Sequence, residues 1–246
     1  NLMIIETLST FPDMYASVMG ASMMRIAQEK GILEFHAHDL RDWTHDRHRT
    51  TDDEPYGGGD GLVMKCAPIF EAYEDICSRA SKPYTIFLAP QGRRFDDAAA
   101  CELAKQDHLL FICGHYEGID ERAYTLADEV ISLGDYVLTS GELASMVVID
   151  AVVRKLPGVL GAETGALGES FADGLLEYPQ YTRPANFNGM EVPAVLLSGN
   201  HGAVDRWRRE QSLERTYRLR PDLLEGMELP DADRAFLQSL STEEQQ

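Results

Sequence analysis

The stretch Ile112–Arg122 reads Ile-Cys-Gly-His-Tyr-Glu-Gly-Ile-Asp-Glu-Arg, and Ile131–Leu143 reads Ile-Ser-Leu-Gly-Asp-Tyr-Val-Leu-Thr-Ser-Gly-Glu-Leu. In each stretch, an apolar run of strand length breaks into a loop dense in glycine, carboxylate and tyrosine. Glycine-rich loops lose much conformational entropy on folding, and loops on a rigid scaffold often carry binding residues. We therefore expect these two loops to form the floor of a ligand site.

Working outward, five short runs have the composition and length of β-strands. They cover residues 3–8, 32–37, 84–88, 109–113 and 129–133. Helical patterns separate most of them: one apolar stripe runs from Ile69 to Ala80, and another runs from Phe95 to Leu103 behind Asp96 as the N-cap. This alternation favours an α/β fold with an open, mostly parallel sheet.

A further helix is predicted from about Glu142 to Lys155, with Leu143, Met146, Val147 and Val153 facing inward. Pro157-Gly158 ends this helix, so the first domain is predicted to span residues 1–160.

Residues 161–172 contain three glycines and no sustained periodicity, which predicts a flexible linker. A small, mainly helical second domain is predicted over residues 173–246. Within it, Val192–Leu197 looks like a strand, and an arginine-rich helix is expected from about Gly202 to Arg218.

Composition limits the classes of function. The chain of 246 residues is 44% hydrophobic, which is ample for a packed core, but its formal charge of −19 opposes general attraction to a polyanion. Any nucleic-acid partner must therefore meet a local basic patch. The four cysteines lack CxxC spacing, so we expect buried thiols in a reducing cytoplasm, with neither disulfides nor a zinc site. The sequence shows neither a membrane-length apolar run nor a signal-peptide pattern, which predicts a soluble, cytoplasmic protein.

Three of the predicted strands end in loops with special composition, at residues 88–92, 113–118 and 132–136. The carboxyl ends of neighbouring parallel strands meet at one edge of a sheet, so a shared pocket is expected there. The alternative is that these glycines only permit tight turns. A dinucleotide fingerprint is absent after the first strand, and the glycine run at 57–61 lacks the lysine and hydroxyl of a P-loop, so both kinds of phosphate site are disfavoured.

Two segments have the composition of RNA contacts. Residues 42–59 combine histidine, arginine and tyrosine with a glycine run, and the arginine-rich helix is locally basic. The alternative for each is an ordinary solvated surface. A metal at His45 and His48 is disfavoured because Arg47 and Arg49 would repel it. Trp207, Leu213 and Tyr217 are expected to pack in the core rather than stack on bases.

Seven motifs, in order and over nearly the whole chain, resemble the bacterial tRNA (guanine-N1)-methyltransferase (TrmD) family. They are Thr44–Thr50, Pro55–Gly59, Gly114–Arg122, Leu133–Leu138, Pro157–Gly161, Tyr181–Pro184 and Leu197–His201.

The resemblance implies a SPOUT-superfamily domain with a deep trefoil knot, and a homodimer with active sites at its interface. It implies methyl transfer from S-adenosylmethionine to N1 of guanosine 37 of tRNA, when nucleotide 36 is also guanosine. The small C-terminal domain would then help to grip the anticodon stem.

The resemblance also assigns roles to residues. The cofactor would contact Phe87, Leu88, Ala89, Pro90, Gly114, Tyr116, Glu117, Ile131, Ser132, Leu133, Gly134, Tyr136, Val137, Leu138, Ser140 and Gly141. The tRNA would contact His45, Arg47, Tyr56, Gly57, Gly58, Gly59, Asn200 and Arg208.

N1 of guanine bears a proton and becomes nucleophilic as that proton leaves, so a carboxylate base and a cation near O6 are wanted. By the resemblance, Glu169 is the general base and Arg154 stabilises O6. The family usually has aspartate where this chain has Glu169, and the longer side chain moves the carboxylate outward. Glu117 is the reserve base and a candidate contact for magnesium.

Two other functions stay open. One is a non-catalytic RNA-binding protein that retains the fold, and the other is a knotted methyltransferase that acts on a ribose 2′-hydroxyl of RNA.

Overall fold

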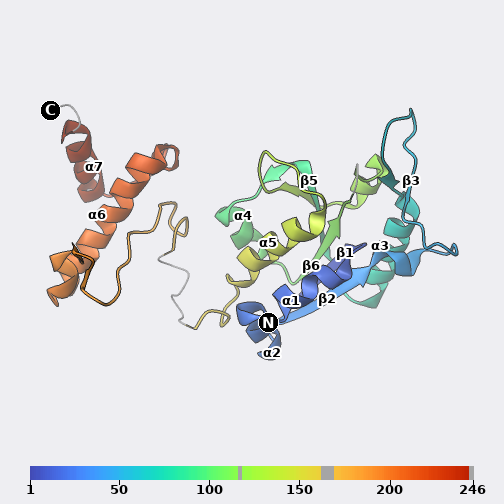
Figure 1. Cartoon of the computed structure of the whole chain (residues 1–246), viewed down its shortest axis with the longest axis horizontal. Helices are drawn as coiled ribbons and strands as arrows, with labels where there is room; N and C mark the ends of the chain where they lie inside the picture. Colours follow the sequence, from blue (N-terminus) through green and yellow to red (C-terminus); the bar gives the residue numbers. More distant parts are fainter. Residues whose placement is uncertain (116–117, 162–168, 244–246) are drawn as a thin grey trace. The chain divides into compact units, whose positions relative to one another are not determined.

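The structure is a computed structural model that describes residues 1–115, 118–161 and 169–243. The chain forms two compact units, residues 1–163 and 164–246. Figure 1 shows the sheet and its helices in the first unit, and α6 and α7 in the second. Most of the predicted linker, residues 162–168, lies outside the described residues.

A five-stranded parallel sheet, in the order β2-β1-β6-β5-β7, organises the first unit. The strands are β1 (Met3–Ser9), β2 (Leu33–Asp39), β5 (Tyr84–Arg94), β6 (His108–Cys113) and β7 (Glu129–Ser132). The five predicted strands and their parallel pairing are therefore confirmed. The order brings the carboxyl ends of β6, β5 and β7 side by side.

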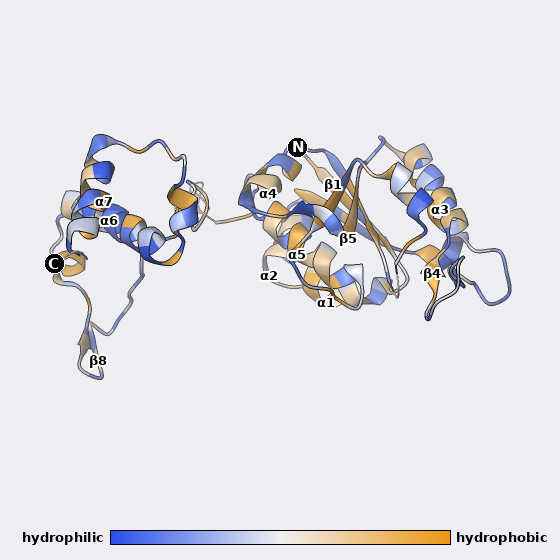
Figure 2. Ribbon diagram, turned by 90° about the horizontal axis from the view of Figure 1, so that it is seen from above, coloured by the Kyte–Doolittle hydropathy of each residue, from blue (hydrophilic) through white to orange (hydrophobic). Residues whose placement is uncertain are grey.

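Helices cover both faces of this sheet. In β6, Leu109 and Phe111 join the core on one face, whereas Leu110 and Ile112 join the core on the other. Figure 2 shows the matching hydrophobic colour along the strands. The first face is covered by α1 (Ala16–Met19), α2 (Ser22–Glu29), α4 (Asp97–Leu103) and α5 (Gly141–Val153), and the second by α3 (Cys66–Arg79), with the 3-10 helices η2 (Leu40–Trp43) and η3 (Glu121–Leu126).

The helix predictions are correct in position but not in every detail. Asp96 caps α4 as predicted, because its carboxylate accepts from the Ala99 N–H at 2.8 Å. In α5, Met146 and Val153 are buried, but Leu143 and Val147 are 49% and 52% exposed. Their predicted inward orientation is wrong, because α5 carries apolar residues around most of its circumference and periodicity does not identify the buried face.

Strand β5 extends beyond its predicted end. Its register shifts between Leu88 and Arg93, and both residues pair with Ile131 of β7. Gly92 permits this return, because a Cβ at that position would lie 2.6 Å from backbone atoms of Ile131. The segment between Leu88 and Arg93 is thus held against the end of β7.

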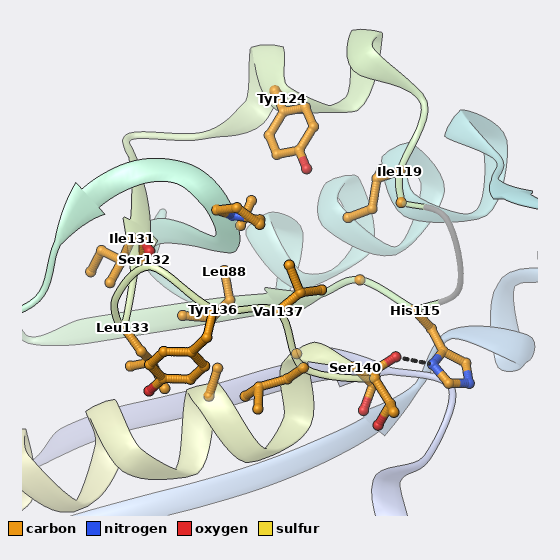
Figure 3. A pocket seen from close by; sticks show the side chains of 18 residues that line it. Leu88, His115, Ile119, Tyr124, Ile131, Ser132, Leu133, Tyr136, Val137 and Ser140 are labelled. Carbon is orange, nitrogen blue, oxygen red and sulfur yellow. Dashed lines mark hydrogen bonds between the residues drawn. The ribbon is translucent and has the colours of Figure 1, made fainter.

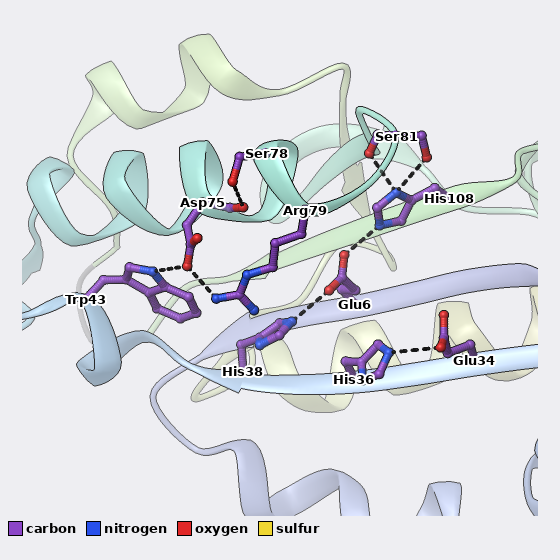
Figure 4. Close-up of polar contacts among 10 residues, drawn as sticks. All are labelled: Glu6, Glu34, His36, His38, Trp43, Asp75, Ser78, Arg79, Ser81 and His108. Atoms are coloured by element: carbon purple, nitrogen blue, oxygen red, sulfur yellow. Dashed lines mark hydrogen bonds and ion pairs between the residues drawn. The ribbon is translucent and has the colours of Figure 1, made fainter.

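A buried polar network lies on the α3 side of the sheet (Figure 4). The Glu6 carboxylate bonds His38 Nε2 at 2.8 Å and His108 Nε2 at 2.6 Å. Burial raises the pKa of Glu6, but the bonds to the two histidines outweigh burial and lower this pKa to about 2. Nearby, Asp75 accepts hydrogen bonds from Trp43 and Arg79.

The second unit contains α6 (His201–Leu219), α7 (Asp231–Glu243), the two-stranded sheet β8 (Asn186–Phe187) and β9 (Met190–Glu191), and the 3-10 helices η4 (Ala194–Leu197) and η5 (Pro221–Leu224). The predicted strand Val192–Leu197 is wrong, because η4 occupies its last four residues and the Leu196 N–H donates to the Pro193 carbonyl. None of the helices in the described ranges is long and apolar enough to cross a membrane.

The four cysteines are free, but the prediction that all are buried is wrong. Cys113 is buried and Cys66 and Cys77 are partly exposed, whereas Cys101 is exposed on α4. Its neighbours Ala99, Ala100 and Leu103 are the buried residues of that helix, so Cys101 lies on the solvent side.

Candidate active site

A cavity of about 190 Å³ lies at the carboxyl ends of β5, β6 and β7 (Figure 3). The predicted shared pocket is therefore confirmed as a feature of the fold. The residues named in the sequence analysis that line it are Leu88, Ala89, Pro90, Gly114, Ile131, Ser132, Leu133, Tyr136, Val137, Leu138, Ser140 and Gly141.

Four other residues expected at the cofactor are not among the described lining residues. Phe87 is fully buried in the core against the Tyr124 ring, 5.0 Å away. Gly134 is not part of the described lining, and its carbonyl accepts from Ser132 Oγ. Tyr116 and Glu117 lie outside the described residues.

Sequence reasoning missed six lining residues, which are His115, Gly118, Ile119, Tyr124, Thr139 and Ala144. Most of them lie inside or next to the quoted loops, so loop membership could have identified them. Tyr124 comes from η3, outside any recognised motif, and Figure 3 shows it approaching the cavity from the side opposite Tyr136. No sequence signal pointed to it.

Two short contacts join the loops that follow β6 and β7. The Gly141 N–H donates to the Gly114 carbonyl at 2.8 Å, and His115 Nδ1 lies 3.0 Å from the Thr139 carbonyl oxygen. A Cβ on Gly141 would lie 3.0 Å from Cys113 Cα and 3.1 Å from the Gly114 nitrogen. Glycine at this position therefore allows the start of α5 to pack closely against the end of β6.

A buried polar cluster includes Cys113 and Ser145, the chain neighbours of the cavity residues Gly114 and Ala144. The Tyr15 hydroxyl lies 2.6 Å from Ser145 Oγ and 3.2 Å from Cys113 Sγ. Burial, with the nearby Glu142 carboxylate, raises the pKa of the Cys113 thiol to about 12. A thiol with this pKa stays protonated at neutral pH, so Cys113 is unsuited to act as a nucleophile.

The glycine run predicted to contact RNA forms an exposed loop. It connects the short strands β3 (Asp52–Asp53) and β4 (Val63–Met64), and it projects from the edge of the first unit (Figure 1). Tyr56 is fully exposed, and Gly57, Gly58 and Gly59 all have positive φ. The Met64 N–H donates to the Gly118 carbonyl at 3.0 Å, which links the base of this hairpin to a cavity residue.

Beside the loop, His45 Nε2 lies 2.8 Å from the Glu71 carboxylate, and Arg47 is exposed. Over the described part of the chain, no group of three or more His, Cys, Asp or Glu side chains could hold a metal ion. Glu117, the candidate contact for magnesium, lies outside that part.

The two residues expected to act on guanine belong to different units. Arg154 is the C-cap of α5, and its N–H donates to the Asp150 carbonyl. Glu169 belongs to the second unit, where it lines a small cavity of about 170 Å³ with Tyr178, Arg208 and Arg209.

Most arginines of α6 are already neutralised within the protein. Arg206 and Arg209 both pair with Asp233, at 3.2 and 3.0 Å, and Arg218 pairs with Glu214 at 2.9 Å. Arg208 instead lies over the Tyr178 ring, 5.0 Å from its centroid. The helix therefore presents less unpaired positive charge than its count of arginines predicts.

Asn200, the other residue of this region expected at the tRNA, is the N-cap of α6 and accepts from the Ala203 N–H at 3.1 Å. Of the three residues expected in the core, Leu213 is fully buried, whereas Trp207 and Tyr217 are partly exposed.

Comparisons with known proteins identify the family of this chain. The family described as tRNA (Guanine-1)-methyltransferase TrmD matches residues 3–226. A protein of Moorella thermoacetica named tRNA (guanine-N(1)-)-methyltransferase is 52% identical over 243 residues, which cover 98% of this chain and 97% of the relative. Proteins of Bacillus cereus and Bacillus anthracis with the same name are 52% identical over 239 residues, covering 96% of this chain and 98% of each relative. The chain therefore belongs to the TrmD family of tRNA (guanine-1)-methyltransferases.

Proposed function

We propose that the protein methylates N1 of guanosine 37 in tRNA, next to a guanosine at position 36, with S-adenosylmethionine as the methyl donor. The match to the TrmD family over residues 3–226 carries this proposal. The cavity at the ends of β5, β6 and β7 supports it, because ligands of open α/β sheets bind at the carboxyl ends of the strands.

The lining of this cavity fits the donor. Leu88, Ile131 and Leu133 offer apolar walls for an adenine ring, while Ser132 and Ser140 contribute hydroxyl groups. Such a mixture, mostly apolar with a few polar groups, is typical of cofactor sites. The volume of about 190 Å³ is below the roughly 300 Å³ of ordinary small-molecule pockets, so part of the donor would extend beyond it.

The donor supplies a methyl group on a sulfonium sulfur, which is already a good leaving group. The chain must therefore contribute placement and acid–base chemistry at the acceptor. The backbone of the two joined loops would fix the position of the methyl carbon. In our proposal the Glu169 carboxylate accepts the proton from guanine N1, and the Arg154 guanidinium stabilises the negative charge that develops on O6.

Glutamate at position 169 requires its own test, because the family usually has aspartate there. A misplacement of about 1 Å can cost about a hundredfold in rate if the backbone does not compensate. We expect Glu169→Gln to lose most single-turnover methylation, and Glu169→Asp to retain it within about tenfold. Full activity of the glutamine variant would remove Glu169 as the base and leave Glu117 as the reserve candidate.

We further propose a homodimer with the active site at its interface. Apolar side chains of the first unit line one surface, together with Asp150. Val18, Tyr136, Leu138, Leu143 and Val147 are exposed there, whereas Leu133 is partly exposed and Met146 is buried. Leu133, Tyr136 and Leu138 also line the donor cavity, so a second copy on this surface would border that cavity. Extended apolar surface of this kind is typical of protein interfaces.

Three finer features of the family accompany the proposal. We expect the SPOUT-type trefoil knot in residues 1–160, and tRNA contacts from the small domain at residues 173–246. The exposed loop with Tyr56 would stack on or grip the RNA, together with His45 and Arg47. Magnesium stays a prediction, tied to Glu117.

Two measurements separate the alternatives. Calorimetry with S-adenosylmethionine tests the non-catalytic alternative, which predicts no binding of the donor. Mass mapping of the methylated nucleoside tests the ribose alternative: our proposal requires 1-methylguanosine, and a 2′-O-methylated nucleoside would contradict it.

A further inference from the structure

A second cavity, of about 390 Å³, lies within the unit of residues 164–246. Its lining includes three aromatic side chains and two arginines, which are Tyr178, Tyr181, Trp207, Arg183 and Arg208. No carboxylate of the described residues lines it, although the chain carries 41 Asp and Glu residues. Flat aromatic faces and cations suit a ligand that is both planar and anionic. Arg208 also lines the adjoining smaller cavity, which has the carboxylates of Glu169, Asp173 and Glu177.

Two different faces of α6 carry the side chains that line the cavity and those that form ion pairs with α7. Val204, Trp207 and Arg208 follow one another at helical spacing, so they lie on one face, and all three line the cavity. Arg206 and Arg209 lie on the face that pairs with Asp233 of α7. The helix therefore uses one set of arginines for internal ion pairs and directs Arg208 into the cavity.

The two arginines of the cavity differ from their neighbours in pairing. In this unit, Arg206, Arg209, Arg218, Arg220 and Arg234 each form an ion pair with a carboxylate. Arg215 donates to the Glu177 carbonyl instead. Arg183 and Arg208 have no ion pair with a carboxylate of any described residue, and Arg208 lies over the Tyr178 ring. In so acidic a protein, two cations left without carboxylates at one cavity point to an anion from outside the chain.

We propose that this cavity binds one nucleotide of the RNA substrate, with its phosphate on Arg183 and Arg208 and its base on the ring of Tyr181. Tyr181 is 50% exposed, so a face of its ring is accessible to a base. Splayed-out bases of RNA characteristically stack on aromatic side chains while arginines hold the backbone. This inference rests on the proposed function for its ligand, since that function supplies the tRNA.

The place of this nucleotide in the strand follows from a shared wall. Tyr178 and Arg208 line both this cavity and the smaller one that contains Glu169. An RNA strand that presents its target guanine to Glu169 would therefore place a nearby nucleotide of the same strand in the aromatic cavity. The cavity would thus help to hold the target base at the proposed general base.

The test measures tRNA affinity of the full chain by fluorescence anisotropy over a range of salt concentrations. Loss of one base–aromatic stack in Tyr181→Ala should weaken binding about 5- to 150-fold, whereas Tyr181→Phe should bind like the wild type. Arg183→Gln should weaken binding and reduce the slope of log affinity against log salt by about 0.7 to 0.9. Arg220→Gln is the matched control, because Arg220 is exposed but paired with Asp222 at 2.7 Å, and it should change neither quantity.

Circular dichroism and thermal melting of each variant serve as the check on folding, because donor binding reports only on the other unit. If Tyr181→Ala and Arg183→Gln both bind tRNA as tightly as the wild type, the inference is overturned and the proposed function stands. If the wild type methylates no tRNA, the proposed function fails. Loss of tRNA affinity in these variants would still support the proposal that the cavity binds a nucleotide of RNA. Equal affinity for guanosine monophosphate and for tRNA would overturn the assignment to RNA.

Discussion

Gly92→Ala tests whether the return of β5 onto β7 shapes the donor cavity. A Cβ at position 92 would lie 2.6 Å from the nitrogen and carbonyl carbon of Ile131, whereas ordinary contact begins at 3.4 Å. These neighbours are backbone atoms, so the two strands must separate by about 0.8 Å rather than rotate a side chain. Ile131 lines the cavity, so its displacement would move one wall of the donor site.

The expected size of the effect follows from this displacement. Overpacking typically costs about 1 to 3 kcal/mol, which corresponds to a fall in Tm of about 2 to 12 °C for a domain of this size. A shift close to 1 Å at a reacting group can lower the rate about a hundredfold. Gly92→Ala should therefore melt earlier, bind S-adenosylmethionine more weakly and lower single-turnover methylation by up to about a hundredfold.

Thermal melting, calorimetry with the donor and single-turnover kinetics measure these three effects. Gly202→Ala is the matched control, because its Cβ would meet only Asn200 Oδ1, at 3.6 Å, in the other unit. It should leave donor binding unchanged. A Gly92→Ala variant with the donor affinity and Tm of the wild type would refute the link between this strand return and the cavity.

Three further predictions concern other parts of the chain. The pKa of Glu6 is lowered from 4.5 to about 2, so the contribution of Glu6 to stability is present above pH 4.5 and is lost as pH falls toward 2. Glu6→Gln should lower the free energy of unfolding by on the order of 3 kcal/mol at pH 7. Chemical denaturation measures this difference between variant and wild type, and a difference that stays constant down to pH 2.5 would contradict the prediction. Leu143→Asp should dissociate the proposed homodimer in sedimentation experiments, whereas Leu219→Asp, at an exposed position of α6, should not; an intact dimer with aspartate at 143 would exclude this surface. Alkylation at pH 8 should label Cys101 first and spare Cys113, whose pKa is raised to about 12, until the protein unfolds; early labelling of Cys113 would argue against its burial.

Local pattern predicted most of the first unit. The strand runs, the Asp96 cap and the convergence of three loops all follow from residue type and spacing, and the structure has each of them. The pattern could not assign the faces of α5, because apolar residues surround most of this helix and an exposed apolar face has the same sequence pattern as a buried one. Leu143 and Val147 were misassigned for this reason.

Contacts between distant residues account for the rest. The continuation of β5 to Arg94 depends on close packing between Gly92 and Ile131, which no local window reports. Tyr124 enters the cavity from a 3-10 helix outside every motif. The charge of α6 was overestimated because its acidic partner Asp233 lies on α7, more than twenty residues away.

The central claim is methyl transfer specific for guanine N1, and one measurement tests it most directly. Single-turnover methylation is compared on two tRNA transcripts that carry guanosine at position 36 and differ only in guanosine or adenosine at position 37, with mass mapping of the product. The account predicts 1-methylguanosine on the first transcript and negligible transfer to the second. Equal methylation of both transcripts would contradict it.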